Sequence, residues 1–405
     1  PPSTPRERPE QAPWLIRQTF HKMTHSLSDA AWIKAPETVK VMAALEAAGI
    51  GSARFVGGCV RNTLRGAPVD DIDIATQLTP DKVMTALKAA GIRAIPTGLE
   101  HGTVTGVCNS KPFEITTLRR DVETDGRRAV VAFTKDWAED AARRDFRLNA
   151  IYADAEGALS EFIPGGIADA KAGRVIFIGD PDERLREDYL RILRFFRFNA
   201  WYGAGIDPDG LAACERQRHG LKQIAAERIW KELRKLLAAP DPAEAIMAME
   251  GAGVLAEILP NSSAGRLPAL VQVEAAINEE MDAMQRFMAL LPRRTRDVTQ
   301  ASDDLKLSNA ERGRLLAWAD AALMPPLGML TAELHAAIYR HGAEAVLDRA
   351  MIEAADSGDR GAMLDVLSVA WGWLVPKCTM GGGDALDVGA EGHSVGEGGG
   401  GGGRD

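Results

Sequence analysis

The chain has 405 residues, of which 46% are hydrophobic and 26% charged, and its formal net charge is -9. This length exceeds what one ordinary hydrophobic core organises, so about two to four domains are expected. The negative charge excludes a uniformly basic nucleic-acid-binding protein but leaves room for a local basic face. No apolar run approaches the roughly 18 residues of a membrane-spanning helix, so no membrane partner is expected.

The cysteines and the N-terminal residues bear on the cellular compartment. Cys59, Cys108, Cys214 and Cys378 lie far apart and form no CxxC pair. This spacing disfavours a zinc ribbon and a disulfide framework. The first residues also lack the apolar core of a signal peptide. We therefore expect a cytoplasmic protein.

The first predicted elements lead into the segment from Arg54 to Thr76. Residues 1–30 are interpreted as a leader, whose proline- and charge-rich start is either a disordered arm or an appended remnant. Apolar residues at helical spacing predict one amphipathic helix from Trp32 to Gly49. The segment itself reads as a strand, a short helix opened by Gly57 and Gly58, and a second strand.

The second of these strands carries Asp71 and Asp73. Residues two apart on a strand point to the same face, so their carboxylates are expected side by side, whereas Asp70 points away. Two adjacent carboxylates repel each other, and a hard divalent cation such as Mg²⁺ relieves the repulsion. The pair therefore indicates metal-assisted phosphoryl or nucleotidyl chemistry.

Further elements follow in chain order. A helix is predicted from Thr79 to Gly91, and strands at RAIPTG, GTVTGVC and FEITTL. From Asp180 to about Trp373 strand signals almost vanish, and stretches rich in Ala, Leu, Glu and Arg predict helices with breaks near 203–209, 239–242, 260–265 and 325–328. The glycine-rich end from Gly381 to Asp405 is expected to be disordered. The predicted fold is α+β: a small head with a mixed sheet, followed by an all-helical body.

Residues near the two aspartates could complete a nucleotide site. Glu114 on the FEITTL strand offers a third carboxylate, although a lone glutamate on a strand is more often a solvated side chain. Backbone N–H groups at Gly57 and Gly58 could approach a triphosphate, and Arg61 could add a contact. A Gly-Gly pair alone also suits an ordinary tight turn.

The segment ARRDFRLNA supplies Arg143, Arg144, Asp145 and Asn149. Arginine suits bidentate phosphate binding, and Asp or Asn suits hydrogen bonds to ribose hydroxyls. A charged helix face is an equally good interpretation of so short a run.

The segment from Gly179 to Phe198 is predicted as a helix that starts near Asp182 and Glu183. On one such helix Asp188 and Arg191 would be adjacent. An ordinary ion pair is one interpretation. The other is a base reader, because a carboxylate beside a guanidinium matches an amino group beside an unprotonated ring nitrogen, as in cytosine and adenine but not guanine or uracil.

The most basic region of the chain follows. An amphipathic helix is predicted from Ala225 to Ala239, and its polar side carries several cations. Solvated side chains are the default interpretation, and an RNA backbone is the alternative. The residues predicted to bind RNA are Arg216, Arg218, Lys222, Lys231, Arg234 and Lys235.

Taken together, these motifs resemble the class II tRNA nucleotidyltransferases, the CCA-adding enzymes of the polymerase-β-like superfamily, and their relatives the bacterial poly(A) polymerases. The resemblance is continuous from Arg54 to Leu237 and weaker in the helical body. It implies that Asp71 and Asp73 bind metal, that Glu114 completes the catalytic carboxylates, and that the following residues contact the nucleotide's phosphates and ribose: Gly57, Gly58, Arg61, Arg143, Arg144, Asp145 and Asn149.

The resemblance also assigns the second half of the site. It implies that Asp188 and Arg191 read the incoming base, and that other residues support them: Glu187, Arg194, Glu227, Arg228 and Glu232. It implies a domain order of leader (1–30), nucleotidyltransferase head (31–178), neck with the base template (179–240), body (241–320), tail (321–380) and glycine-rich end (381–405). Two positions depart from the family pattern, Asn62 and Arg147, and receive no catalytic role.

The activity that the resemblance implies is addition of C, C and A to the 3′ end of tRNA from CTP and ATP, with two Mg²⁺ ions as cofactors. The expected partners are the tRNA acceptor arm, CTP and ATP, with no DNA. PTGLEHGTVTGV resembles the CCA-adding branch more than the poly(A) branch. Open alternatives are poly(A) polymerase, an enzyme that adds only CC or only A, and a non-catalytic RNA-binding protein built on a decayed transferase.

Overall fold

The computed structural model describes residues 26–124, 129–277 and 281–373. Two compact units divide the chain between Lys171 and Ala172. The predicted disordered start and the glycine-rich end both lie outside the described residues. Among the residues described, no helix is long and apolar enough to span a bilayer.

The first unit is built on a seven-stranded mixed sheet with the order β3-β4-β5-β2-β1-β8-β9. The pair β2–β5 is parallel and the other neighbours are antiparallel. The strands are β1 (Ala53–Val56), β2 (Asp73–Thr76), β3 (Arg93–Gly98), β4 (Thr103–Cys108), β5 (Lys111–Thr117), β8 (Ile151–Ala153) and β9 (Leu159–Glu161). A separate antiparallel pair consists of β6 (Arg119–Thr124) and β7 (Ala129–Phe133). The predicted mixed sheet is confirmed.

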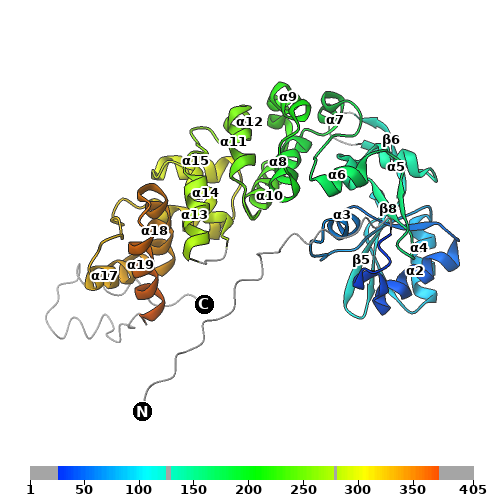
Figure 1. Ribbon diagram of the computed structural model, residues 1–405, viewed down its shortest axis with the longest axis horizontal. Helices are drawn as coiled ribbons and strands as arrows, with labels where there is room; N and C mark the ends of the chain where they lie inside the picture. The colour runs from blue at the N-terminus through cyan, green and yellow to red at the C-terminus, as the bar shows by residue number, and fades with distance from the viewer. Residues whose placement is uncertain (1–25, 125–128, 278–280, 374–405) are drawn as a thin grey trace, which may run out of the picture. The chain divides into compact units, whose positions relative to one another are not determined.

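Helices pack against this sheet. In Figure 1, α2 and α4 lie side by side against it, and α3 packs on β1 and β8. The helices of the unit are α1 (Ala31–Lys34), α2 (Pro36–Ala48), α3 (Gly58–Leu64), α4 (Pro80–Ala89), α5 (Trp137–Ala142) and α6 (Gly166–Ala172), with single turns η1 (Leu99–His101) and η2 (Arg147–Asn149).

The prediction of a single helix from Trp32 to Gly49 is wrong, because the structure has two helices there. The chain breaks at Ala35, which adopts an extended conformation between α1 and α2. Ala35 precedes Pro36, and the proline ring disfavours the helical conformation of the residue before it. The apolar spacing continues across this break, so periodicity alone did not reveal it.

The second unit contains only helices within its described part. They are α7 (Pro181–Glu187), α8 (Leu190–Tyr202), α9 (Pro208–Gln217), η3 (Arg218–Gln223), α10 (Ala226–Leu237), α11 (Ala243–Gly251), α12 (Val254–Ile258), α13 (Leu267–Ile277), α14 (Ala283–Leu290), α15 (Thr295–Asp304), α16 (Asn309–Ala319), α17 (Thr331–His341), α18 (Ala343–Ser357) and α19 (Arg360–Gly372). All four predicted breaks fall between helices. The α+β fold class is therefore confirmed.

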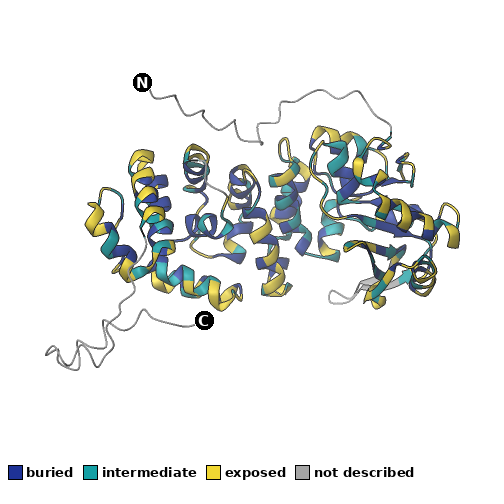
Figure 2. Ribbon diagram, turned by 90° about the horizontal axis from the view of Figure 1, so that it is seen from below, coloured by how far each residue is buried: buried dark blue, intermediate teal, exposed yellow. Residues whose placement is uncertain are grey.

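Burial follows the helical period in α10. Ile229, Trp230, Leu233 and Leu236 are buried, whereas the cations on the same helix are exposed. Figure 2 shows this alternation of buried and exposed stripes on the helices of the second unit. This pattern matches the amphipathic helix predicted from the sequence.

A buried arginine closes the C-terminal end of α10. Arg286 is 1% exposed and donates to Glu274, whose side chain is 3% exposed, with Nη2 and Oε2 2.7 Å apart. Arg286 also donates to the carbonyl oxygens of Leu237, Ala239 and Pro240. The last carbonyls of a helix lack intrahelical partners, so Arg286 satisfies the carbonyl of Leu237, the last residue of α10, together with two carbonyls just after the helix.

We expect Glu274→Ala to lower the free energy of unfolding by about 3–5 kcal/mol, because it leaves the buried Arg286 charge without its carboxylate. Chemical denaturation of the full chain measures this change. Asp303→Ala, which removes the exposed carboxylate paired with Arg312, is the control and should cost no more than about 1 kcal/mol. Equal losses in the two variants would contradict the expectation.

Candidate active site

The three predicted catalytic carboxylates lie near one end of the parallel strand pair. Asp73 on β2 lies directly opposite Glu114 on β5. Burial raises the pKa of Asp73 to about 6, and the negative charges of Glu114 and Asp71 add to this effect. The repulsion anticipated from the sequence is therefore present, and Glu114 is its stronger source.

The position of Asp71 differs from the prediction. The strand begins at Asp73, so Asp71 lies in the segment before it and not on the strand. Exposure still alternates here, since Asp71 is exposed, Ile72 buried and Asp73 half-buried. The alternation of exposure was predicted correctly, but the strand starts two residues later than predicted.

The Gly57-Gly58 turn leaves a gap in front of Asp73. Gly57 has φ +73° and precedes α3, as predicted. A Cβ built on Gly57 would stand 3.6 Å from Asp73 Oδ2 and 4.0 Å from Arg144 Nη1. A side chain here would be strained by the positive φ and would also fill this gap. The turn thus brings the backbone close to two of the predicted nucleotide contacts.

Arg61, Asn149 and Asp145 form a buried chain of hydrogen bonds. Arg61 Nη1 donates to Asn149 Oδ1 at 2.6 Å, and Asn149 Nδ2 donates to Asp145 Oδ1 at 2.9 Å. Arg61 also donates to Asn62 Oδ1 from Nε and Nη2. Asn62, which received no role from the sequence, therefore holds Arg61, and its own amide donates to Pro68 O.

Arg143 and Arg144 converge on a residue that sequence reasoning missed. Both donate to Asp140 on α5. Burial raises the pKa of Asp140, but the positive charges of Arg144 and Arg143 lower it by more. The pKa of Asp140 therefore lies below its ordinary value. The signal in the sequence was the spacing of three and four residues between Asp140 and the two arginines, which places them together on a helix.

The donor atoms suit a hard cation. Asp73, Glu114 and Asp71 offer only carboxylate oxygens, the ligands that Mg²⁺ prefers, and Asp73 is destabilised as an anion. Among the described side chains, no three His, Cys, Asp or Glu groups are close enough to hold one ion together. An ion here would complete its shell with water or phosphate oxygens, as Mg²⁺ commonly does.

We expect Mg²⁺ to raise the melting temperature of the metal-free protein at about pH 7.5 and much less at about pH 5, because metal binding requires deprotonated ligands. The folded pKa of Asp73 is raised, so without metal its contribution to stability decreases as pH rises toward 6. Differential scanning fluorimetry at both pH values measures the effect. Asp73→Asn should remove the Mg²⁺ response, and a response independent of pH would contradict the assignment.

The predicted base reader lies in the second unit, and its local structure corrects the prediction. The helix expected through Asp188 is broken there: α7 ends at Glu187, Asp188 is extended with φ -153°, and α8 begins at Leu190. Asp188 and Arg191 are therefore not on one helix surface. Asp188 Oδ1 accepts from Leu190 N at 3.1 Å, so its side chain stabilises the start of α8.

Two of the predicted supporting residues, Glu187 and Arg228, contact the base reader. Arg191 Nη1 donates to Glu187 Oε2 at 2.5 Å and to Arg184 O at 2.8 Å. Arg228 Nη2 donates to Asp188 Oδ2 at 3.2 Å. Glu227 is exposed on the first turn of α10, and the Arg194 guanidinium lies over Phe198. Glu232, which was also predicted to support the base reader, accepts a hydrogen bond from Arg197 Nε at 2.6 Å.

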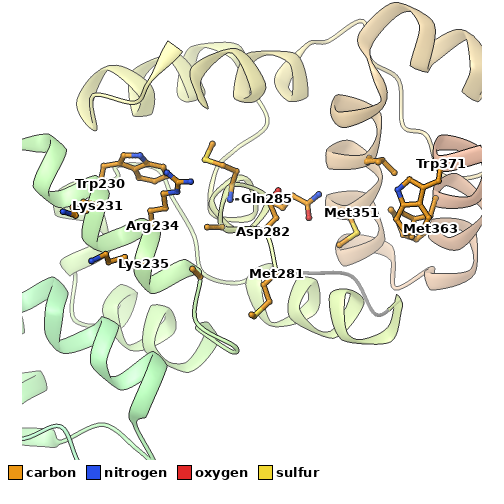
Figure 3. Close-up of a pocket in the computed structure, with 15 residues that line it drawn as sticks. Trp230, Lys231, Arg234, Lys235, Met281, Asp282, Gln285, Met351, Met363 and Trp371 are labelled. Atoms are coloured by element: carbon orange, nitrogen blue, oxygen red, sulfur yellow. Dashed lines mark hydrogen bonds between the residues drawn. The ribbon is translucent and has the colours of Figure 1, made fainter. Parts of the chain in front are cut away.

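Several residues predicted to bind RNA already face carboxylates. Arg216 pairs with Asp182, Arg234 with Glu311, and both Arg218 and Lys222 with Glu257. Lys231, Arg234 and Lys235 line one side of a cavity of about 820 Å³, and Met281, Met351, Met363 and Trp371 lie across it (Figure 3). The structure thus places three of the six cations at one groove.

Comparison with known proteins places these features in a family. A model described as the poly A polymerase head domain matches residues 53–176, and one described as the probable RNA and SrmB-binding site of polymerase A matches residues 205–265. The first match covers the sheet with Asp73 and Glu114.

Individual relatives extend the match. The CCA tRNA nucleotidyltransferase 1, mitochondrial, of Mus musculus is 38% identical over 64% of this chain and 60% of its own length. The CCA-adding enzyme of Latilactobacillus sakei is 33% identical over 64% of this chain and 72% of its own length. The alignments span about 60% of the mitochondrial relatives from zebrafish (Danio rerio) and mouse.

Solved structures agree with the fold over most of the chain. The crystal structure of the Bacillus stearothermophilus CCA-adding enzyme in complex with CTP has a TM-score of 0.71 and 28% identity, and the match covers 88% of each chain. A Thermotoga maritima CCA-adding enzyme shares the fold at a TM-score of 0.65, with 17% identity over 89% of this chain and 88% of its own. On the sheet, its carboxylates and these matches, the chain belongs to the family of CCA-adding tRNA nucleotidyltransferases.

Proposed function

We propose that this chain adds C, C and A to the 3′ end of tRNA, using CTP and ATP. The observation that carries the proposal is the group formed by Asp73, Glu114 and Arg144 around the open Gly57 turn. Relatives at 33–38% identity are described as CCA-adding enzymes or CCA tRNA nucleotidyltransferases. The related Bacillus structure holds CTP.

In the proposed reaction, the terminal tRNA hydroxyl attacks the α-phosphorus of the nucleotide, and the bond to pyrophosphate breaks. Asp71 and Asp73 would hold two Mg²⁺ ions, and Glu114 would lie near the attacking hydroxyl. When bound, the ions supply a lowered hydroxyl pKa and neutralise charge on the phosphate oxygens. Arg143 and Arg144 would bind and orient the triphosphate through charge-assisted hydrogen bonds.

Base choice is assigned to the break between α7 and α8. Asp188 offers an acceptor and Arg191 offers donors, and Glu187 and Arg228 hold the two side chains. CTP and ATP both present an amino group beside an unprotonated ring nitrogen. GTP and UTP present the opposite arrangement and would leave the protein groups mispaired.

The tRNA is expected on the basic side of α10. Lys231, Arg234 and Lys235 lie at the groove of Figure 3 and can hold phosphates without reading sequence. The paired residues Arg216, Arg218, Lys222 and Arg234 would have to exchange their carboxylates for phosphate. Binding should therefore weaken steeply as the salt concentration rises.

Incubation of tRNA lacking CCA with each nucleotide tests the function directly. CTP alone should add two residues, CTP with ATP should add CCA, and GTP or UTP should add none. Sequencing of the products distinguishes the alternatives. Addition of long A-tracts would identify a poly(A) polymerase, the activity named in the matching family model, and a product ending at CC or lacking CC would identify a partial enzyme.

The compartment is also a proposal. Cys59, Cys108 and Cys214 are free and buried among the described residues, which is consistent with a reducing environment. The mitochondrial names of three relatives leave both the cytoplasm and the mitochondrion open. Imaging of the tagged full-length protein in its own cells separates the two.

A further inference from the structure

Asp140 is the meeting point of the two arginines assigned to the triphosphate. Arg143 Nε donates to Asp140 Oδ1 at 2.9 Å, and Arg144 Nη2 donates to Asp140 Oδ2 at 3.0 Å. The Asp140 side chain is 2% exposed, whereas those of Arg143 and Arg144 are 17% and 20% exposed. The carboxylate is thus buried, whereas the two arginine side chains remain partly exposed.

Tyr152 on β8 fixes the same arrangement from the sheet. Its hydroxyl donates to Asp140 Oδ2 at 2.9 Å and accepts from Arg144 Nε at 3.2 Å. The Tyr152 ring is fully buried and packs edge-to-face on Trp137 and Phe162. Arg144 is therefore held through Nε and Nη2 by groups on two different elements, α5 and β8.

Nη1 of Arg144 lies near the Gly57 turn, on the side of Asp73. Nη1 is 4.0 Å from the place where a Cβ of Gly57 would stand, and Asp73 Oδ2 is 3.6 Å from that place. A guanidinium that Asp140 and Tyr152 already orient needs no further ordering when an anion arrives. Preorganised side chains lower the entropic cost of binding.

We propose that Asp140 and Tyr152 are positioning residues, which hold Arg143 and Arg144 in the orientation that receives the nucleotide's triphosphate. This inference rests on the proposed function, because it assigns the anion as a nucleoside triphosphate. The opposing interpretation is that the cluster only stabilises the fold. The two interpretations differ in one result: only the positioning role makes the loss of nucleotide binding in a variant depend on the number of phosphates.

Isothermal titration of the full-length protein with CTP, CDP and CMP tests the proposal. Asp140→Asn should weaken CTP binding about tenfold or more and CMP binding less than about threefold, because charge-assisted arginine–phosphate contacts lose their geometry. Tyr152→Phe keeps the buried ring and should show the same phosphate dependence at about three- to tenfold. Glu139→Gln, on the same helix and paired with Arg120 instead, is the matched control and should bind all three like the wild type.

Each outcome decides a separate point. Equal losses for CTP and CMP, or no loss in folded Asp140→Asn, would overturn the positioning role. If Asp140→Asn does not fold, the phosphate dependence of Tyr152→Phe decides the question alone. A wild-type protein that binds CTP no more tightly than CMP would instead refute the proposed function. In steady-state assays the KM values for CTP and ATP should rise by the same factor, while the KM for tRNA stays unchanged.

Discussion

Asp73→Asn is expected to slow nucleotide addition by about a thousandfold or more, which corresponds to ~4 kcal/mol of transition-state stabilisation. Asp73 lies opposite Glu114 and beside the open Gly57 turn, so it is the central oxygen ligand of the proposed site. An amide cannot replace a carboxylate in neutralising the charge of a divalent ion. Asp73 is half-buried and is not a core residue, so the variant should remain folded.

Primer extension on tRNA lacking CCA, with saturating CTP, measures this loss. The control is Asp70→Asn, because Asp70 is exposed and predicted to point away from the site; its rate should stay within about twofold of the wild type. The affinity for tRNA should be unchanged in both variants. An Asp73→Asn enzyme with a near-normal rate would remove Asp73 from the chemistry.

Asp188→Ala is expected to reduce the preference for CTP over UTP by about a hundredfold or more, since a site built to hydrogen-bond one base edge rejects the opposite edge through mispaired groups. The Asp188 side chain also has a structural role, because its Oδ1 accepts a hydrogen bond from Leu190 N at the start of α8. Alanine would remove both functions. Asp188→Asn separates them, since the amide oxygen can still accept from Leu190 while the amide nitrogen presents a donor to the base.

The ratios of kcat/KM for the four nucleotides measure the effect in each variant. Both substitutions should leave the affinity for tRNA nearly intact. Asp182→Asn is the control: Asp182 lies on the first turn of α7, where it pairs with Arg216 and Gln217. Unchanged selectivity in Asp188→Asn would show that another residue reads the base.

The sequence predicted those parts of the fold that depend on local patterns. Strands β3 to β5 and helix α4 have their own glycine, proline and alternation signals, and the structure reproduces them. The break at Asp188 was missed because apolar residues keep helical spacing on both sides of it. Its cause is a side-chain bond to Leu190 and the ion pair with Arg228, 40 residues away. Periodicity contains no information on such a contact.

Long-range partners explain the other omissions in the site. The spacing of Asp140 to the two arginines is visible in the sequence, but its hydrogen bond with Tyr152, on a different element, is not. Arg147 departs from the family pattern, and its Nε lies 2.8 Å from Oδ2 of the buried Asp169. The separation of these two residues in the sequence does not suggest this ion pair. Residue types at the site could thus be chosen from the sequence, whereas the groups that hold them required coordinates.

Arg286 has a consequence for the motions of the proposed RNA-binding helix. Its bonds join the last carbonyl of α10 and the residues just after it to α14, and through Glu274 to α13. Opening the end of α10 therefore exposes a buried charge, so the last turn cannot fray by itself as helix ends usually do. Amide hydrogen exchange in this turn should then be as slow as in α14, and the three helices should become labile to exchange together.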